Sequence, residues 1–341
     1  MISFESDYTE GAHPLIIDAL ARTNMEQLAG YGGDIYSQRA KEKIRKACGR
    51  EDAEVFFIAG GTQANMVVIS SVLRQYEGVI AASTGHIAVH EAGAIENAGH
   101  KVFTLPAHEG KLDPDEVKNF IEDFFADVSH EHMPFPGMVY ISYPSEYGTL
   151  YSADELGRLY SVCRSYDIPL FIDGARLGYG LMSEGCDLTL PRLAELCDMF
   201  YIGGTKVGAL LGEAVVFTNR KAPAHFITMI KQKGAMLAKG RVIGLQFDTL
   251  FTDDLYFSIA LNAINTARLM KSIFIEKGYR LFIDSPTNQQ FIIIPNEKLA
   301  ELEKSVKFSV WQKYDDENTV VRFATSFATS AENVRYLERI L

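Results

Sequence analysis

The sequence predicts an α/β protein with a mostly parallel sheet in its larger part and a smaller domain at its end. Between residues 54 and 218, short apolar runs alternate with longer amphipathic runs, a pattern typical of βαβ crossovers and parallel strands. The apolar runs are nearly continuous, as expected for strands covered by helices on both faces. The length of 341 residues fits two domains at about 150 residues each.

Seven apolar runs are expected as strands, over Val55–Ile58, Gly78–Ala82, Lys101–Leu105, Met138–Ser142, Ile168–Asp173, Met199–Ile202 and Ala214–Thr218. Helices are expected between most of them, including Ala64–Tyr76, Asp113–Phe125 and Ser152–Tyr166. Two of these helices carry start signals. Asp113 is followed by Pro114, which suits the first helical position, and Ser152 with Glu155 forms a capping-box pattern.

The flanking segments predict further helices and a second, smaller sheet. A helix is expected from His13–Pro14 to about Leu28, then a loop over Tyr31–Asp34, and a long helix from Arg241 to about Glu276. Strands near Gln289–Ile294 and Thr319–Ala324 and a terminal helix complete the chain. We expect residues 1–245 to form an N-terminal segment and the large domain, and residues 246–341 the connecting helix and a small α+β domain.

Composition and charge exclude several classes of protein. The chain is 47% hydrophobic and 23% charged, as in ordinary globular proteins. Its 33 Lys and Arg against 44 Asp and Glu give a net charge of −11, which argues against nucleic acid and anionic membranes as partners. No apolar run approaches the ~20 residues of a membrane span.

The expected compartment is the cytoplasm. The first ten residues contain acids and no basic segment before an apolar stretch, so no signal peptide is expected. The four cysteines, Cys48, Cys163, Cys186 and Cys197, lack paired spacing and suit reduced thiols.

A glycine pair joins the first of these strands to a helix. Gly60 and Gly61 lie between the apolar run and Thr62-Gln63-Ala64-Asn65. The first N–H groups of a helix have no partner inside it, so such a turn can bind a phosphate group. The alternative is an ordinary tight turn between strand and helix. No P-loop sequence is present.

An acid and a lysine follow two later strands. Asp173 ends one apolar run and Lys206 follows another, after Gly203-Gly204-Thr205. A buried acid needs a partner, although Asp173 could instead cap a helix. A desolvated lysine has a lowered pKa and suits a covalent bond to a carbonyl compound; alternatively Lys206 extends to the surface.

Together these three segments indicate pyridoxal 5'-phosphate. This cofactor needs a lysine for covalent attachment, an acid that keeps its ring nitrogen protonated, and a cradle for its phosphate. In an open α/β sheet, ligands bind at the carboxyl ends of the strands, and all three signals lie there.

These segments resemble the L-threonine aldolase family of the beta-eliminating lyase group. The resemblance rests on Gly60–Asn65, Asp173–Arg176 and Gly203–Lys206, and it is supported by Ser6-Asp7, Gly33–Tyr36, Gly212–Ala214 and Arg322. It implies the PLP-dependent transferase-like fold type I, with a mostly parallel seven-stranded sheet between helices and a small C-terminal α+β domain. It also implies a lyase that cleaves L-threonine or L-allo-threonine to glycine and an aldehyde.

The resemblance also implies roles toward the cofactor. Lys206 would bind it covalently, Asp173 would contact its ring nitrogen, and Arg176 would lie near its 3-oxygen and the substrate. His86 would stack on the ring and relay a proton. Gly61, Thr62 and Gln63 would bind the phosphate, with Thr205 as an addition. Lys206, His86 and Asp173 are the expected catalytic residues.

Toward the amino-acid substrate, Arg322 would bind the carboxylate as a fork, a task that lysine cannot copy. Ser6 would assist Arg322, and Tyr36 would reach a neighbouring subunit's site. The family is commonly a homo-oligomer, a dimer of dimers, with active sites at the dimer interface.

The chain departs from the family pattern at one position. Many of these aldolases carry a histidine in the loop where this sequence reads Tyr143-Pro144-Ser145-Glu146. Glu146 could take the substrate's hydroxyl proton if its pKa were raised. The general base therefore remains open among His86, Glu146 and water.

The same sequence features are compatible with other functions. The same residues would serve a β-eliminating lyase that releases a keto acid and ammonia, and a non-catalytic PLP-fold binding protein is the alternative of another class. No G-x-G-x-x-G opens a helix, which argues against an NAD dehydrogenase. His86 and His90 have the spacing of a metal pair beside Glu91, but without a third ligand we expect no metal.

Overall fold

A seven-stranded sheet forms the centre of the larger domain. In the computed structural model, which describes residues 1–341, its strand order is β2-β8-β7-β6-β5-β3-β4. The strands are β2 (Glu54–Ile58), β3 (Glu77–Ala82), β4 (Val102–Leu105), β5 (Phe135–Ser142), β6 (Leu170–Asp173), β7 (Met199–Gly203) and β8 (Glu213–Phe217). β8 runs opposite to the other six strands, and all pairs that do not include β8 are parallel. All seven predicted strands are confirmed.

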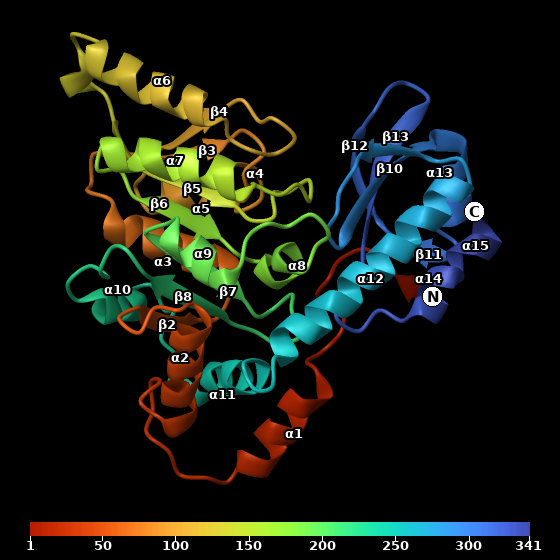
Figure 1. Cartoon of the computed structure of the whole chain (residues 1–341), viewed down its shortest axis with the longest axis horizontal. Helices are drawn as coiled ribbons and strands as arrows, with labels where there is room; N and C mark the ends of the chain where they lie inside the picture. The colour runs from red at the N-terminus through yellow and green to blue at the C-terminus, as the bar shows by residue number, and fades with distance from the viewer.

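The larger domain also contains helices, most of which pack on this sheet (Figure 1). They are α1 (Pro14–Thr23), α2 (Ile35–Ala47), α3 (Gly61–Val72), α4 (His86–Val89), α5 (Ala94–Asn97), α6 (Pro114–Ala126), η1 (His130–His132), α7 (Ala153–Ser165), α8 (Leu177–Leu181), α9 (Leu190–Glu195), α10 (Phe226–Gln232) and α11 (Arg241–Leu250). Both predicted caps form: the Asp113 carboxylate accepts the first-turn N–H groups of α6, and Ser152 and Glu155 cap α7 reciprocally. None of the helices is long and apolar enough to span a membrane.

Two helix boundaries differ from the prediction. The helix predicted to reach Leu28 ends at Thr23. The residues after it form a loop, in which the carbonyls of Asn24 and Glu26 accept hydrogen bonds from the Arg241 guanidinium. The single helix predicted from Arg241 to Glu276 is two helices, α11 and α12 (Leu255–Glu276). Asp253 and Asp254, with φ of 50° and 54°, break the pattern through left-handed conformations that aspartate tolerates better than most residues.

The small domain is built on an antiparallel sheet of order β12-β13-β10-β9. Its elements are β9 (Arg280–Ile283), β10 (Gln289–Pro295), α13 (Asn296–Leu302), β11 (Val306–Lys307), β12 (Ser309–Lys313), β13 (Asn318–Ala324), α14 (Ala331–Arg335) and α15 (Leu337–Ile340). The two predicted strands correspond to β10 and β13. The edge strands β9 and β12 were not predicted, because the apolar run of β9 is only three residues long, Leu281–Ile283, and β12 contains polar residues at three of its five positions.

Helix α12 joins the two domains and belongs to both cores. Its first half packs Ile259 and Ala263 into the large core, and its second half packs Met270 and Phe274 into the small core. In Figure 1 it runs from the large domain to the small one.

The beginning of the chain lies on the small domain. Strand β1 (Ile2–Ser3) pairs with β11, and Phe4 is buried in the small core. Both ends of the chain therefore lie at the small domain (Figure 1). The predicted division at residues 245 and 246 stays a prediction, but these first residues pack on the C-terminal domain and not on the large one.

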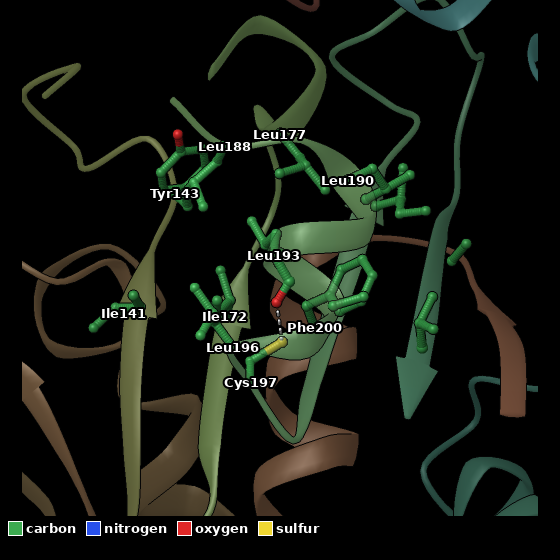
Figure 2. Close-up of a cluster of buried hydrophobic side chains, with 14 of the residues drawn as sticks. Ile141, Tyr143, Ile172, Leu177, Leu188, Leu190, Leu193, Leu196, Cys197 and Phe200 are labelled. Atoms are coloured by element: carbon green, nitrogen blue, oxygen red, sulfur yellow. Dashed lines mark hydrogen bonds between the residues drawn. The ribbon is translucent and has the colours of Figure 1, made fainter. Parts of the chain in front are cut away.

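The large core fills the space beside β6 and β7. Ile172, Leu193 and Phe200 lie together there (Figure 2). The Cys197 thiol donates to the Leu193 carbonyl at 3.3 Å. All four cysteines are unpaired, and burial raises the pKa of the Cys48 thiol to about 12. This packing fixes the strand ends at which the polar residues meet.

Candidate active site

Polar residues from many parts of the chain line one cavity at the carboxyl ends of the central strands. The cavity has a volume of about 330 Å³. It gathers most of the predicted cofactor residues: Gly61, Thr62, His86, Asp173, Arg176, Thr205 and Lys206. Gln63, predicted beside them, does not line it.

A second cavity, of about 590 Å³, shares part of this lining. His86, Arg176 and Lys206 face both cavities, and the second adds Arg322 and Trp311 from the small domain. The site is therefore built from both domains, with Lys206 in reach of both spaces.

The start of α3 forms one wall of the inner cavity. No side chain caps this helix at Gly60, so the first N–H groups have no internal acceptor. A Cβ atom on Gly61 would lie 3.1 Å from the Tyr201 hydroxyl oxygen, and the space around Gly60 is open. The N-terminus of this helix can thus bind an anion through its backbone.

Asp173 is buried and satisfied as an anion. Oδ2 accepts from the Tyr140 hydroxyl at 2.6 Å and from Asn65 Nδ2 at 2.9 Å. Oδ1 accepts from the Tyr201 hydroxyl and the Ala175 N–H. Burial raises the pKa of Asp173, but the charge of His86 and these hydrogen bonds outweigh it and hold the pKa below its usual value. An ionised acid here can hold a proton on a ring nitrogen.

His86 contacts two glutamates. Its ring Nδ1 lies 2.7 Å from Glu91 Oε1, and its backbone N–H donates to Glu146 Oε1 at 2.8 Å. His86, Glu91 and Asp173 each place one atom within 4.8 Å of the others. Asn65 bridges the two carboxylates, so hydrogen bonds connect the three residues.

Lys206 lies in a loop braced by a buried acid. Glu213 Oε2 accepts the Gly204 N–H at 3.0 Å and Oε1 accepts the Thr205 hydroxyl at 2.8 Å. Burial and the charge of Arg176 lower the pKa of Lys206, whereas burial raises the pKa of Glu213. A lysine with a lowered pKa has more of the neutral amine that reacts with an aldehyde.

Thr205 is predicted as an addition to the phosphate site, but its hydroxyl already acts as both a donor and an acceptor within the protein. It donates to Glu213 and accepts the Gly212 N–H at 3.1 Å. In this structure the Thr205 hydroxyl stabilises the lysine loop.

Arg176 is bound by an acid from the start of the chain. Its Nε and Nη2 donate to Oδ2 and Oδ1 of Asp7 at 2.6 Å and 2.9 Å. Asn288 of the small domain also donates to Asp7, at 2.9 Å. Although burial raises the pKa of Asp7, the charges of Arg176 and Lys206 lower it to about 2. Nη1 of Arg176 makes none of these bonds and remains available to a ligand.

Arg322 lines the outer cavity. Its Nη2 donates to the Glu5 carbonyl and the Ser309 hydroxyl, and its Nη1 donates to Gln289. Nε is buried without a partner, and the guanidinium lies 5.1 Å from the Trp311 ring centroid. Burial and the charge of Arg176 lower the pKa of Arg322 to about 10. A substrate carboxylate bound to Arg322 would supply the hydrogen-bond acceptor that its buried Nε–H lacks.

Two predicted substrate residues do not line these cavities. Ser6 is buried and absent from both linings. The Tyr36 hydroxyl donates to Glu26 at 2.8 Å, and Tyr36 faces a separate cavity between α1, α2 and α11. Its predicted role in a neighbouring subunit stays a prediction.

Glu146 stands at the predicted departure from the family pattern and lines both cavities. Oε1 accepts from the Ser142 hydroxyl at 2.5 Å and from the His86 N–H. Burial and the charge of Asp173 raise the pKa of Glu146, whereas the Ser142 hydrogen bond and the charge of His86 lower it, and the net shift is upward. A raised pKa is the condition that a glutamate base requires here.

Sequence reasoning did not assign several residues of the site. They are Asp7, Asn65, Glu91, Tyr140, Tyr201, Glu213 and Trp311. The signal for Asp7, Asn65 and Glu213 was available, since all three stand in motifs that carry or support the resemblance. Tyr140 and Tyr201 lie within apolar strands, where nothing in the sequence distinguishes them from core residues.

The residues present fit pyridoxal phosphate. The uncapped start of α3 suits the phosphate, the ionised Asp173 suits the ring nitrogen, and Lys206 with its lowered pKa suits the aldehyde. All three line one cavity, whose volume lies in the range of small-molecule sites.

Known proteins are similar to this chain in sequence and in fold. Residues 3–290 match the family model described as beta-eliminating lyase. The chain is 30% identical over 338 residues to the low specificity L-threonine aldolase of Pseudomonas sp. (strain NCIMB 10558), covering 98% of this chain and 95% of that protein. The structure of Leishmania major threonine aldolase matches with a TM-score of 0.95 and 40% identity, covering 99% of each chain. An aspartate aminotransferase mutant of Thermus thermophilus shares the fold, with a TM-score of 0.71 at 18% identity over 100% of this chain and 92% of the other.

Proposed function

The chain belongs to the beta-eliminating lyase family, and we propose that it is a pyridoxal-phosphate-dependent aldehyde-lyase. It cleaves L-threonine, L-allo-threonine and related β-hydroxy-α-amino acids to glycine and an aldehyde. Relatives that carry the name threonine aldolase and align over nearly the whole chain support this reaction.

One observation carries the proposal: the cradle at Gly61, the acid Asp173 and the amine Lys206 line one cavity, and Arg322 lines the adjoining one. The first three suit the cofactor, and the fourth suits the carboxylate of an amino acid. Lys206 and Arg176 face both cavities, so a substrate held by Arg322 can reach the amine that binds the cofactor.

When bound, pyridoxal phosphate accepts the electron pair released as the Cα–Cβ bond breaks. The protein supplies the rest. Asp173 would hold a proton at the ring nitrogen, Arg322 would fix the substrate carboxylate, and Lys206 would hold the cofactor through its amine. His86 or Glu146, which face both cavities, takes the proton of the β-hydroxyl group.

We also propose a cytoplasmic homo-oligomer, arranged as a dimer of dimers, with active sites at the dimer interface. Exposed apolar side chains on and beside α1 and α2 support this assembly: Leu15, Ile17, Met25, Tyr31 and Ile35. Tyr36 lines a cavity together with Leu15, which places it beside these side chains.

One assay separates this reaction from β-elimination. Purified protein is incubated with pyridoxal phosphate and L-threonine, and acetaldehyde, glycine and 2-oxobutanoate are measured in the same sample. Acetaldehyde with an equal amount of glycine is expected. 2-Oxobutanoate in their place would show elimination, and a protein that retains cofactor but forms no product would be a binding module.

A further inference from the structure

A buried set of hydrogen bonds connects Asp173 with the ring of His86. Asn65 Nδ2 donates to Asp173 Oδ2 at 2.9 Å and to Glu91 Oε1 at 2.7 Å. Since both hydrogens of this amide meet carboxylates, the opposite amide orientation would set its oxygen against two anions. Asn65 therefore fixes Glu91 relative to the acid that serves the cofactor.

Glu91 determines which nitrogen of His86 carries hydrogen. The Glu91 side chain is completely buried, and Oε1 lies 2.7 Å from His86 Nδ1. An ionised carboxylate only accepts hydrogen bonds, so Nδ1 is the donor. In the neutral ring, Nε2 then carries the free lone pair.

Because Nδ1 is bonded to Glu91, Nε2 is the ring nitrogen of His86 that is left for a ligand in the cavities. His86 lines both cavities and its side chain is 34% exposed, while its Nδ1 edge is turned toward the buried Glu91. The backbone of His86 is fixed as well, because its N–H donates to Glu146. The ring therefore presents a base to the space where the substrate lies.

The hydrogen-bond partners of Glu91 differ from those expected of a residue whose only role is packing. Oε1 has two donors, whereas Oε2 is buried with no partner, which costs stability. A negative charge beside an imidazole stabilises the cation that forms when the ring takes a proton.

We propose that Glu91 is a positioning residue for carbon–carbon cleavage. It holds His86 with hydrogen on Nδ1, so that Nε2 accepts the proton of the substrate's β-hydroxyl group, and its charge stabilises the resulting imidazolium. As the O–H bond breaks and the Nε2–H bond forms, the O–H electron pair becomes the second C–O bond of the aldehyde. The Cα–Cβ pair stays on Cα, which takes up a proton from water to give glycine. This inference rests on the proposed aldol cleavage.

The test compares Glu91→Gln with Glu96→Gln, a matched control at an exposed glutamate on α5. Two-bond ¹H–¹⁵N spectra of ¹⁵N-histidine-labelled, cofactor-free protein report the tautomer of His86, assigned with His86→Gln. The wild type and Glu96→Gln should show hydrogen on Nδ1. Glu91→Gln should show a mixture, because its amide can donate as well as accept.

Two activities of the holoenzyme separate positioning from structural damage. Retro-aldol kcat should fall about 10- to 100-fold in Glu91→Gln, as for other orienting partners of histidine, with KM for threonine nearly unchanged. Exchange of the α-hydrogen of glycine in D₂O involves no hydroxyl proton and should stay within about threefold of wild type. Glu91→Asp, which retains the charge, should lose less of the cleavage rate than Glu91→Gln.

Three results would overturn the inference: hydrogen on Nε2 in the wild type, an unchanged tautomer in Glu91→Gln, or equal losses of cleavage and exchange. The wild-type spectrum and Glu91→Asp decide the matter even where Glu91→Gln does not fold. A wild type that exchanges glycine but does not cleave threonine would refute the proposed function, and the spectra would still test the tautomer.

Discussion

Arg176 and Asp7 form a two-bonded ion pair between the large domain and the start of the chain, with N–O distances of 2.6 Å and 2.9 Å. Asn288 of the small domain donates to the same carboxylate. An arginine expected to contact cofactor and substrate is thereby held in place by two segments distant in sequence. Its position depends on how the N-terminal segment and the small domain pack against the sheet.

Replacing Asp7 with Asn should destabilise the fold by about 3–5 kcal/mol at pH 7, because the buried guanidinium of Arg176 loses its partner. The folded-state pKa of Asp7 is about 2, below the ordinary 3.8, so its contribution is present above pH 4 and is lost as the pH falls toward 2. Urea unfolding at pH 7 and at pH 3 should show a smaller difference between the two proteins at the lower pH. An equal difference at both would contradict this account of the ion pair.

Lys206→Ala should abolish covalent attachment of the cofactor and lower turnover by more than about 1000-fold, or about 4 kcal/mol in the barrier. Borohydride reduction followed by mass spectrometry measures the attachment, with the exposed Lys304→Ala as the control. Turnover at the wild-type rate in Lys206→Ala would refute the role of this lysine.

Arg322→Lys should raise KM for L-threonine about 10- to 100-fold, because a single ammonium cannot reproduce a charged two-bonded contact worth about 1.5–3 kcal/mol. Cofactor affinity, measured by titration, should remain that of the wild type. Arg280→Lys, at an exposed position of strand β9 in the same sheet, serves as the control. A parallel loss of cofactor would assign Arg322 to the cofactor site.

Glu146→Gln should retain most of the cleavage rate if His86 is the base, because the amide oxygen can still accept from Ser142 and from the His86 N–H. The measurement is kcat for threonine beside the exchange rate of the α-hydrogen of glycine. A selective loss of cleavage of about 100-fold or more would instead assign the proton transfer to Glu146.

Gly148→Ala should destabilise the protein by about 2–4 kcal/mol. Its φ is +71°, and an added Cβ would contact Ser285 Oγ and lie 2.6 Å from Thr287 Oγ1 in the small domain. Gly185 has a similar φ of +78° but open space around its Cβ position, so Gly185→Ala should cost only the backbone strain of about 1 kcal/mol. Equal denaturation midpoints for the two variants would show that the contact between domains contributes nothing.

The sheet was predictable because each of its strands is a short apolar run between turns and helices, and seven such runs became seven strands. The small domain was less predictable from the sequence, since β12 exposes polar residues at a sheet edge and shows no alternation of apolar and polar residues that would indicate a strand. The predicted single helix after Arg241 failed at Asp253 and Asp254, where backbone conformation overrides the helical pattern.

The site was predictable where one residue carries the chemistry, as for Lys206, Asp173 and Arg322. It was not predictable where the role comes from a neighbour distant in sequence. Asp7 acquires its function from Arg176, and Glu91 from Asn65 and His86. Such pairs arise only when the chain has folded.

The pairing of β1 with β11 and the burial of Phe4 in the small core determine when the small domain can fold during synthesis. Residues 2–4 are made about 300 residues before the strand with which β1 pairs. The large domain can collapse during translation, but the small core stays incomplete until residues 306–337 have been made and meet residues 2–4. Removing the first five residues should therefore impair the end of the chain, 300 residues away in sequence, more than the sheet that follows them.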